Sequence, residues 1–334
     1  MSQIGTNTMT VASPGSDVAL AGSATQRDLF LKLFSGETLT TFNTETTAKP
    51  LIRVRSVRGQ KSVQFPAIGK VGAEFHQPGE EIVGQSVRHS EAIINIDDLL
   101  VSSVFVSNFI EAMSHYDVRG EYARQMGDAL AQHYDKKVYS LAVKACFDER
   151  ANVLPENGAA SRVQIGTTPT IDDIVDAIYE TQAFFDKNNI PRLDRVIVVD
   201  PDTYYEFVKD GRFLNRDYGN DGNGSQSDAS ILKVAGLPII KSNNLALDFS
   251  NGGSDDLAVE REGSVLGDFR VDASTVKALV LQKQAIGAAH LMELATEAEY
   301  SARFQGDLLL AKMANGMDVL RPECLRVIDA TNET

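Results

Sequence analysis

The chain has 334 residues, of which 43% are hydrophobic and 23% charged, and its formal net charge is −14. This composition predicts a globular protein with a sizeable core and two closely connected domains. Such an acidic average surface excludes tight wrapping of nucleic acid, because affinity for phosphates comes from cationic contacts, although the protein could still enclose nucleic acid. No apolar run approaches the ~20 residues that cross a membrane. The first basic residue is Arg27, so no secretory signal is expected.

The two cysteines, Cys146 and Cys324, are expected to be buried free thiols rather than a disulfide. A soluble, reducing compartment follows from this expectation.

The N-terminal residues 1–24 are rich in Ser, Thr, Gly and Ala, which predicts a mobile tail. A short amphipathic helix is expected next, ended by Gly36. Its apolar residues are Leu29, Phe30, Leu33 and Phe34. Residues 38–47 are rich in threonine and are interpreted as an extended connector.

A long extended arm is predicted from residue 51 to residue 100. Ile52 and Val54 alternate with Arg53 and Arg55 at its start, and the return strand is expected at 92–100. Ile94 and Ile96 of the return strand share one face. If each leg holds ~18 extended residues at ~3.3 Å, the loop reaches about 60 Å, against a radius of gyration of roughly 20 Å for a compact chain. Such a hairpin is marginally stable alone and needs a surface beyond its own domain.

A helix of ~25 residues, a rod of roughly 40 Å, is predicted to follow. Asn108 with Glu111 has the spacing of a capping box, and Asp117 is a second possible start. Its apolar stripe is Tyr122, Met126, Leu130, Tyr134, Val138, Leu141, Ala142 and Ala145. Gly120 and Gly127 leave a break in its first half possible.

The second half predicts alternating helices and strands. Thr170 and Asp173 form a capping box before a helix that stops near 188–191, and Asp200-Pro201 begins another helix. Strands are predicted at 196–199, 237–241, 277–282 and 324–328, loops at 151–169 and 210–229, and an extended or weakly helical segment at 291–300. A short helix is expected at 307–315, closed by Gly316.

No catalytic, cofactor or metal site is predicted. The histidines are scattered at His76, His89, His115, His133 and His290, without metal-ligand spacing. Residues 217–222 with Asp228 partly copy a calcium loop, but the third position is Gly, so a flexible loop is favoured. Asp200 lies where α/β enzymes bind ligands, yet a helix cap explains it more simply.

Charge separates the two legs of the arm. Residues 49–61 contain Lys49, Arg53, Arg55, Arg58 and Lys61 and no acid. Residues 74–98 contain Glu74, Glu80, Glu81, Glu91, Asp97 and Asp98 against Arg88. Both legs are either solvated faces or partners for opposite charges on neighbouring subunits, where pairs worth ~0–1 kcal/mol set register. The candidate inter-subunit contacts are Arg53, Arg55, Arg58, Lys61, Phe65, Glu80 and Glu81.

Several motifs in one order resemble the major capsid proteins of short-tailed phages of the Autographiviridae kind. They are Lys61-Ser62-x-Gln64-Phe65-Pro66-x-x-Gly69, Pro78-Gly79-Glu80, Ile94-x-Ile96-Asp97-x-Leu99-Leu100, Ala112-Met113-x-His115-Tyr116-Asp117-Val118-Arg119, Asp194-Arg195-Val196, Asp200-Pro201-Asp202, Phe304-Gln305-Gly306-Asp307 and Leu320-Arg321-Pro322-Glu323. The resemblance covers most of the chain and is thinnest at 1–24 and 210–276.

The resemblance implies an α+β fold of the Hong Kong type, shared by tailed-phage capsids and encapsulin shells. It implies an N-terminal tail and arm (1–50), an extended β-hairpin loop with flanking strands (51–100), a peripheral domain with a long spine helix (101–165), an axial α/β domain (166–285) and a return to the peripheral domain (286–334). The axial loop near 210–229 departs most from the family.

The same resemblance implies assembly rather than catalysis. Pentamers and hexamers would close into an icosahedral virion shell that encloses double-stranded DNA without sequence-specific binding and without a membrane. Scaffolding protein and portal would assist in the host cytoplasm. The alternatives left open are an encapsulin-like cellular compartment and an oligomeric α/β enzyme that uses the Asp200 edge.

Overall fold

The protein is described by a computed structural model that covers residues 26–69, 71–73, 75–76, 79, 81, 84, 86–96, 99–107, 118–154, 157–210, 224–225, 230–231, 233–245, 269 and 271–332. The described residues within 1–43, 101–129 and 294–312 form one compact unit, called unit 1, and the other described residues form unit 2. Helix α3 and strands β12 and β13 contribute residues to both units.

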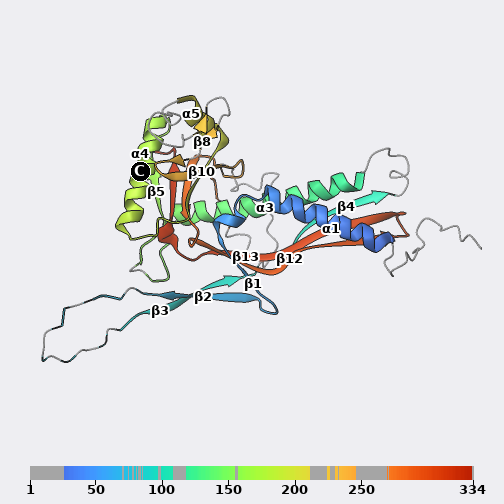
Figure 1. The fold of residues 1–334 in the computed structure, drawn as a ribbon, viewed down its shortest axis with the longest axis horizontal. Helices are drawn as coiled ribbons and strands as arrows, with labels where there is room; N and C mark the ends of the chain where they lie inside the picture. Colours follow the sequence, from blue (N-terminus) through green and yellow to red (C-terminus); the bar gives the residue numbers. More distant parts are fainter. Residues whose placement is uncertain are drawn as a thin grey trace, which may run out of the picture. The chain divides into compact units, whose positions relative to one another are not determined.

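The chain contains both helices and strands, as in an α+β fold (Figure 1). The helical elements are α1 (Gln26–Glu45), η1 (Lys49–Leu51), α3 (Val118–Phe147), α4 (Ile171–Lys187), α5 (Pro201–Asp210) and η7 (Pro322–Cys324). The strands are β1 (Arg53–Ser56), β2 (Ser62–Ile68), β3 (His89–Asn95), β4 (Leu99–Ser107), β5 (Ser161–Gln164), β6 (Arg195–Val199), β7 (Gly224–Ser225), β8 (Ser230–Ile231), β9 (Lys233–Val234), β10 (Leu237–Lys241), β11 (Val276–Gln282), β12 (Ile286–Ser301), β13 (Gly306–Val319) and β14 (Leu325–Asp329).

Two larger sheets organise the chain. One has four strands in the order β1-β12-β13-β4, and the other has six in the order β5-β14-β11-β6-β10-β9. Every residue of β6 and β14 is buried, including the charged Arg195, Arg326 and Asp329, as expected for strands inside a covered sheet. Helix α4 contacts β14 and β11 and lies alongside this sheet (Figure 1).

Several predicted elements are confirmed in this region. The capping box of Thr170 and Asp173 is present with both of its hydrogen bonds, and the helix it starts ends at the C-cap Asn188. The strands predicted at 196–199, 237–241 and 277–282 are β6, β10 and β11. Cys324 ends η7 instead of starting β14.

The prediction that Gly36 ends the first helix is wrong, because α1 continues to Glu45. The connector predicted at 38–47 is therefore helical over most of its length. Thr38 Oγ1 donates to the Phe34 carbonyl at 2.9 Å, which satisfies the hydroxyl within the helix. Phe34 and Phe42 are both buried, so packing of this face outweighs the roughly 1 kcal/mol that a glycine costs in a helix.

The long helix is confirmed as α3, which runs without a break through Gly120 and Gly127. Within unit 1, Gly127 permits close packing on α1. A Cβ added there would lie 2.7 Å from the Thr38 carbonyl oxygen and 3.0 Å from Thr41 Cβ. The glycine that suggested a break is therefore a contact point between two helices.

Two further predictions are wrong. The loop predicted at 151–169 contains β5, which pairs in parallel with β14. The short helix predicted at 307–315 is instead part of β13. Its residues favour a helix, but pairing in the four-stranded sheet overrides that propensity. Gly316, expected to close a helix, allows β13 to pass close to β3, since a Cβ there would collide with the Asn95 carbonyl oxygen.

Some predictions fall outside the described residues. These are the tail at 1–24, the capping box at 108–111, the start at Asp117 and the partial calcium loop at 217–222 with Asp228. Among the described residues, Cys146 and Cys324 are buried free thiols, as predicted. The described helices include none that is long and apolar enough to cross a membrane.

Candidate assembly surface

The β2–β3 ribbon of unit 2 divides cleanly into two faces. The strands pair antiparallel over their full length, from Ser62 opposite Asn95 to Ile68 opposite His89. Burial alternates along both strands. The inner face packs in a buried cluster of Val63, Phe65, Ala92, Ile94, Ala289 and Leu320. This cluster attaches the base of the ribbon to β12 and to the residue after β13.

The outer face of the ribbon and the segment beyond it expose apolar side chains. Ile93 has a relative exposure of 48% and Ile68 of 63%, while Val71 reaches 67% and Phe75 104%. Ile68 and Ile93 lie on the paired strands β2 and β3, and Val71 and Phe75 follow β2 in the chain. Exposed apolar residues that form a contiguous patch are typical of surfaces that bind another protein.

A basic group lies beside the inner face of the ribbon. Strand β1 pairs in parallel with β12, and each of its four residues is exposed. The guanidinium carbons of Arg53 and Arg55 lie 5.5 and 5.9 Å from the centroid of the Phe65 ring. Arg55 also donates to the Gln64 carbonyl at 3.3 Å. These contacts hold two cations in place without neutralising them.

The predicted contact residues are therefore brought together in part. Arg53, Arg55, Arg58 and Lys61 are all exposed, and none forms an ion pair with a residue that the structure describes. Phe65 is 4% exposed, so its ring supports the two arginines from within the same chain.

None of the acidic residues described in residues 74–98 forms an ion pair with this basic group. Glu81 is exposed, and Glu80 lies outside the described residues. Glu91 accepts a hydrogen bond from Gln64 Nε2 at 3.3 Å, across the ribbon. Glu74, Asp97 and Asp98 also lie outside the described residues.

A buried carboxylate fixes the segment before β1. Asp135 of α3 accepts hydrogen bonds from Thr46 Oγ1 at 2.8 Å, from the Thr47 backbone N–H at 2.8 Å and from the Ala48 N–H at 3.0 Å. Thr47 Oγ1 adds a fourth bond at 2.7 Å. Hydrogen bonds to a buried charged group are among the stronger ones in proteins, so residues 46–48, which precede β1, are fixed to α3.

A histidine–tyrosine pair supports the same region. His290 of β12 lies opposite Ser56 of β1, and its carbonyl accepts from the Val57 N–H at 2.8 Å. Its Nε2 lies 3.1 Å from the Tyr134 hydroxyl. Burial lowers the pKa of His290, and the charge of Lys49 adds to the effect. The neutral imidazole is thus the form that fits this site.

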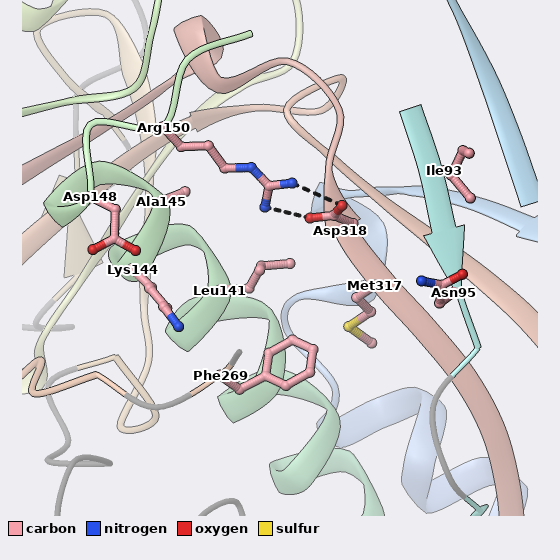
Figure 2. Close-up of a pocket in the computed structure, with 10 residues that line it drawn as sticks. All are labelled: Ile93, Asn95, Leu141, Lys144, Ala145, Asp148, Arg150, Phe269, Met317 and Asp318. Carbon is pink, nitrogen blue, oxygen red and sulfur yellow. Dashed lines mark hydrogen bonds and ion pairs between the residues drawn. The ribbon is translucent and has the colours of Figure 1, made fainter. Parts of the chain in front are cut away.

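A groove of about 390 Å³ opens beside the ribbon base (Figure 2). Its apolar lining includes Leu141, Ala145, Phe269, Met317 and the exposed Ile93. Arg150 forms a two-point ion pair with Asp318, at 2.6 and 3.0 Å. The polar side chains that line the groove are Asn95, Lys144, Asp148, Arg150 and Asp318.

Asp200, the candidate of the enzyme alternative, is a helix cap. Its carboxylate accepts hydrogen bonds from the backbone of Asp202 and Thr203 at the start of α5. Burial raises its pKa, and the charge of Asp202 adds to this. The described residues include no group of three or more His, Cys, Asp or Glu that could hold a metal ion.

Sequence reasoning missed two sets of surface residues. The exposed apolar residues of the ribbon and of the segment beyond it were not predicted, because the interpretation of this region rested on its charges. Ile68, Val71, Phe75 and Ile93 are apolar residues in the sequence that do not fall on the buried positions of the ribbon. The turn between β12 and β13 was missed because β13 was predicted as a helix. A period of two in 291–300 was the signal that could have extended that strand into a hairpin.

Comparison with known proteins assigns the chain. Residues 64–328 match the family model described as "Gp10A-like: Major capsid protein". The chain is 31% identical to the major capsid protein of Escherichia phage T7 over 344 aligned positions, which cover 96% of this chain and 95% of that protein.

Solved capsids have the same fold. The capsid structure of cyanophage P-SCSP1u superposes with a TM-score of 0.70 at 33% identity, covering 85% of this chain and 87% of the other. The mature capsid of bacteriophage PhiM1 gives 0.67 at 18% identity, covering 86% and 88%. The α+β fold of tailed-phage capsids is thereby confirmed. The chain belongs to the Gp10A-like major capsid proteins, structural components of the virion that form the phage head shell and are not enzymes.

Proposed function

We propose that the β2–β3 ribbon is the extended loop by which each subunit lies over a neighbouring subunit in the shell. The observation that carries the proposal is the division of the ribbon into a buried inner face and an outer face with exposed Ile68 and Ile93, together with the exposed Phe75 in the segment beyond it. A two-stranded ribbon is marginally stable in water, so a neighbour that covers its outer face would stabilise it.

The basic group would set the register of this contact. Arg53 and Arg55 are held over the Phe65 ring, and Arg58 and Lys61 extend the positive charge. Carboxylates of the neighbour, including Glu80 and Glu81 of its own loop, are the proposed partners. Charge pairs of this kind contribute more to partner choice than to affinity.

The remaining assignments follow the same proposal. Residues 1–50 form the N-terminal arm, 51–100 the extended loop, 101–165 and 286–334 the peripheral domain with α3 as its spine, and 166–285 the axial domain. Subunits would form pentamers and hexamers that close into an icosahedral shell, with scaffolding protein and portal in the host cytoplasm. Several weak contacts made together give a cooperative shell.

The acidic composition fits a shell that encloses double-stranded DNA. A net charge of −14 provides few cations to bind phosphates, so packaged DNA would be contained without being gripped.

A double charge reversal tests the register contact. Arg55→Glu with Arg58→Glu should leave the subunit folded, because both side chains are exposed, while reducing closed shells at least about tenfold through like-charge repulsion. Lys209→Glu with Lys283→Glu, two exposed lysines elsewhere in unit 2, changes the net charge equally and serves as the control. Negative-stain microscopy counts the shells. Normal shells from the arginine double variant would remove these charges from the contact.

A further inference from the structure

A short hairpin joins α3 to β5 in unit 2 and carries an Asn-Gly pair next to its turn. The Asn152 N–H donates to the Gly158 carbonyl at 3.0 Å, which closes the turn. Ala151 and Ala159 form a bridge between the two legs just before this bond. Asn157 and Gly158 therefore lie where the chain leaves the turn and enters the return leg.

Both reacting groups of this Asn-Gly pair are free. The Asn157 N–H donates to the Leu154 carbonyl at 2.9 Å, but the side-chain amide of Asn157 forms no hydrogen bond with any residue that the structure describes. The Gly158 N–H likewise has no acceptor in the described part of the chain. Gly158 is exposed and has a φ of 108°, and the absence of a side chain leaves its nitrogen open to close approach. Asparagine is chemically labile, and an unbound backbone nitrogen beside its amide is the group that attacks it.

The same dipeptide at Asn315-Gly316 is held in a protected state. Asn315 lies in β13 and is 4% exposed, and its Oδ1 accepts a hydrogen bond from Lys137 Nζ at 3.1 Å. A Cβ on Gly316 would collide with the Asn95 carbonyl oxygen, so the backbone is packed closely there. Strand β13 is also paired on both sides, with β12 and β4. Reaction at this pair requires local opening of the sheet, whereas the pair in the hairpin needs none.

We propose that Asn157 is a site of spontaneous modification, at which asparagine converts without an enzyme into aspartate and isoaspartate. The Gly158 nitrogen attacks Cγ of Asn157, the proton of the N–H passes through water to the amide nitrogen, and ammonia leaves as a succinimide ring closes. Water then opens the ring at either carbonyl, which gives aspartate or isoaspartate, the latter continuing the backbone through Cγ. Water is the sole co-reactant. The proposal concerns the single subunit and is independent of the contact proposed for the ribbon.

The modification disturbs the contact of the hairpin with a buried carboxylate. Glu323 is 2% exposed and accepts a hydrogen bond from Asn152 Nδ2 at 2.6 Å. The return leg packs on the same side chain, since a Cβ on Gly158 would lie 3.4 Å from Glu323 Cβ. Isoaspartate lengthens the backbone directly before Gly158, and both products add a negative charge next to this contact. The hairpin should therefore open more often in the modified chain.

Incubation of intact subunits at mildly alkaline pH tests the site. Digestion at acidic pH stops the reaction, and mass spectrometry of the peptides then measures the exchange of amide for acid. Asn157 should convert at least about tenfold faster than Asn315 in the folded chain, because the buried pair reacts only from opened molecules. In urea both pairs are exposed, so the two rates should become similar. Asn157→Gln, which retains an amide but cannot close the same ring, is the control.

The peptide that contains Asn157 should also be labelled by an isoaspartate methyltransferase, and the same peptide of Asn157→Gln should not. The proposal is overturned if Asn157 reacts no faster than Asn315 in folded subunits, or if it stays intact there while it reacts in urea. Amide hydrogen exchange of residues 150–160 measures the loosening of the hairpin. Faster exchange in the aged unmodified sequence than in equally aged Asn157→Gln supports it, and equal exchange would overturn the disturbance of the Glu323 contact.

Discussion

Truncation of Phe65 and of Phe75, both in the predicted extended loop, should have different effects on the stability of the subunit. Phe65 is 4% exposed and belongs to the cluster that attaches the ribbon, whereas Phe75 has a relative exposure of 104%. Phe65→Ala should lower the free energy of unfolding of the subunit by about 3 kcal/mol or more, since it leaves a cavity and removes the ring beneath Arg53 and Arg55. Phe75→Ala should change it by less than about 0.5 kcal/mol.

Shell assembly, unlike subunit stability, should be sensitive to Phe75→Ala. Burial of one phenylalanine side chain in a neighbour contributes about 2 kcal/mol, so Phe75→Ala should weaken each such contact about thirtyfold. Shells of this variant should form at a higher subunit concentration, although the subunit itself is intact.

Urea unfolding followed by circular dichroism measures the first effect, and the concentration at which shells appear on a gradient measures the second. The reasoning is refuted if Phe75→Ala destabilises the isolated subunit as much as Phe65→Ala, because Phe75 would then pack on its own subunit. It is refuted equally if Phe75→Ala shells form at the concentration of the unmodified chain.

Two predictions concern the fold that carries the ribbon. Gly127→Ala should destabilise the subunit by about 1–3 kcal/mol, because the new methyl group collides with Thr38, whereas Gly36→Ala, with nothing within 4 Å, should stabilise it by up to about 1 kcal/mol; equal effects in urea unfolding would contradict the close helix contact. Since the folded pKa of His290 lies below its ordinary 6.5, the unfolded chain takes up the proton first, so the contribution of His290 to the free energy of unfolding should be constant above pH 6.5 and fall as the pH drops below it. His290→Gln should flatten this pH dependence between about pH 7.5 and pH 5.5, and an unchanged slope would assign it to other groups.

The sequence predicted well those elements whose local signals agree with their environment. The capping box of Thr170 and Asp173, and the apolar run of β6, need no information from distant residues. The long helix α3 was predicted because its apolar stripe has a helical period over many turns, although a break at Gly120 and Gly127 was left open.

The errors occurred where distant residues decide. Gly36 permits a helix end but does not require one, and the burial of Phe42 continues α1. The residues of β13 favour a helix and become a strand because neighbouring strands pair with them. A pattern in one segment does not show which strand lies beside it, since that contact spans a large sequence separation.

Only part of the candidate surface could be predicted from the sequence. The charge pattern located the basic leg, and its arginines are indeed exposed and without ion pairs among the described residues. The inward direction of Phe65 depended on the register of β2 against β3, which fixes the face of every side chain in the ribbon.

The central claim is that the outer face of the ribbon becomes buried when copies of the chain assemble. Amide hydrogen exchange of residues 62–95, compared between free subunits and closed shells, tests it most directly. Slower exchange of this segment in shells is the predicted result, with buried strands such as β6 protected in both states. Equal exchange of residues 62–95 in free subunits and in shells would contradict the claim.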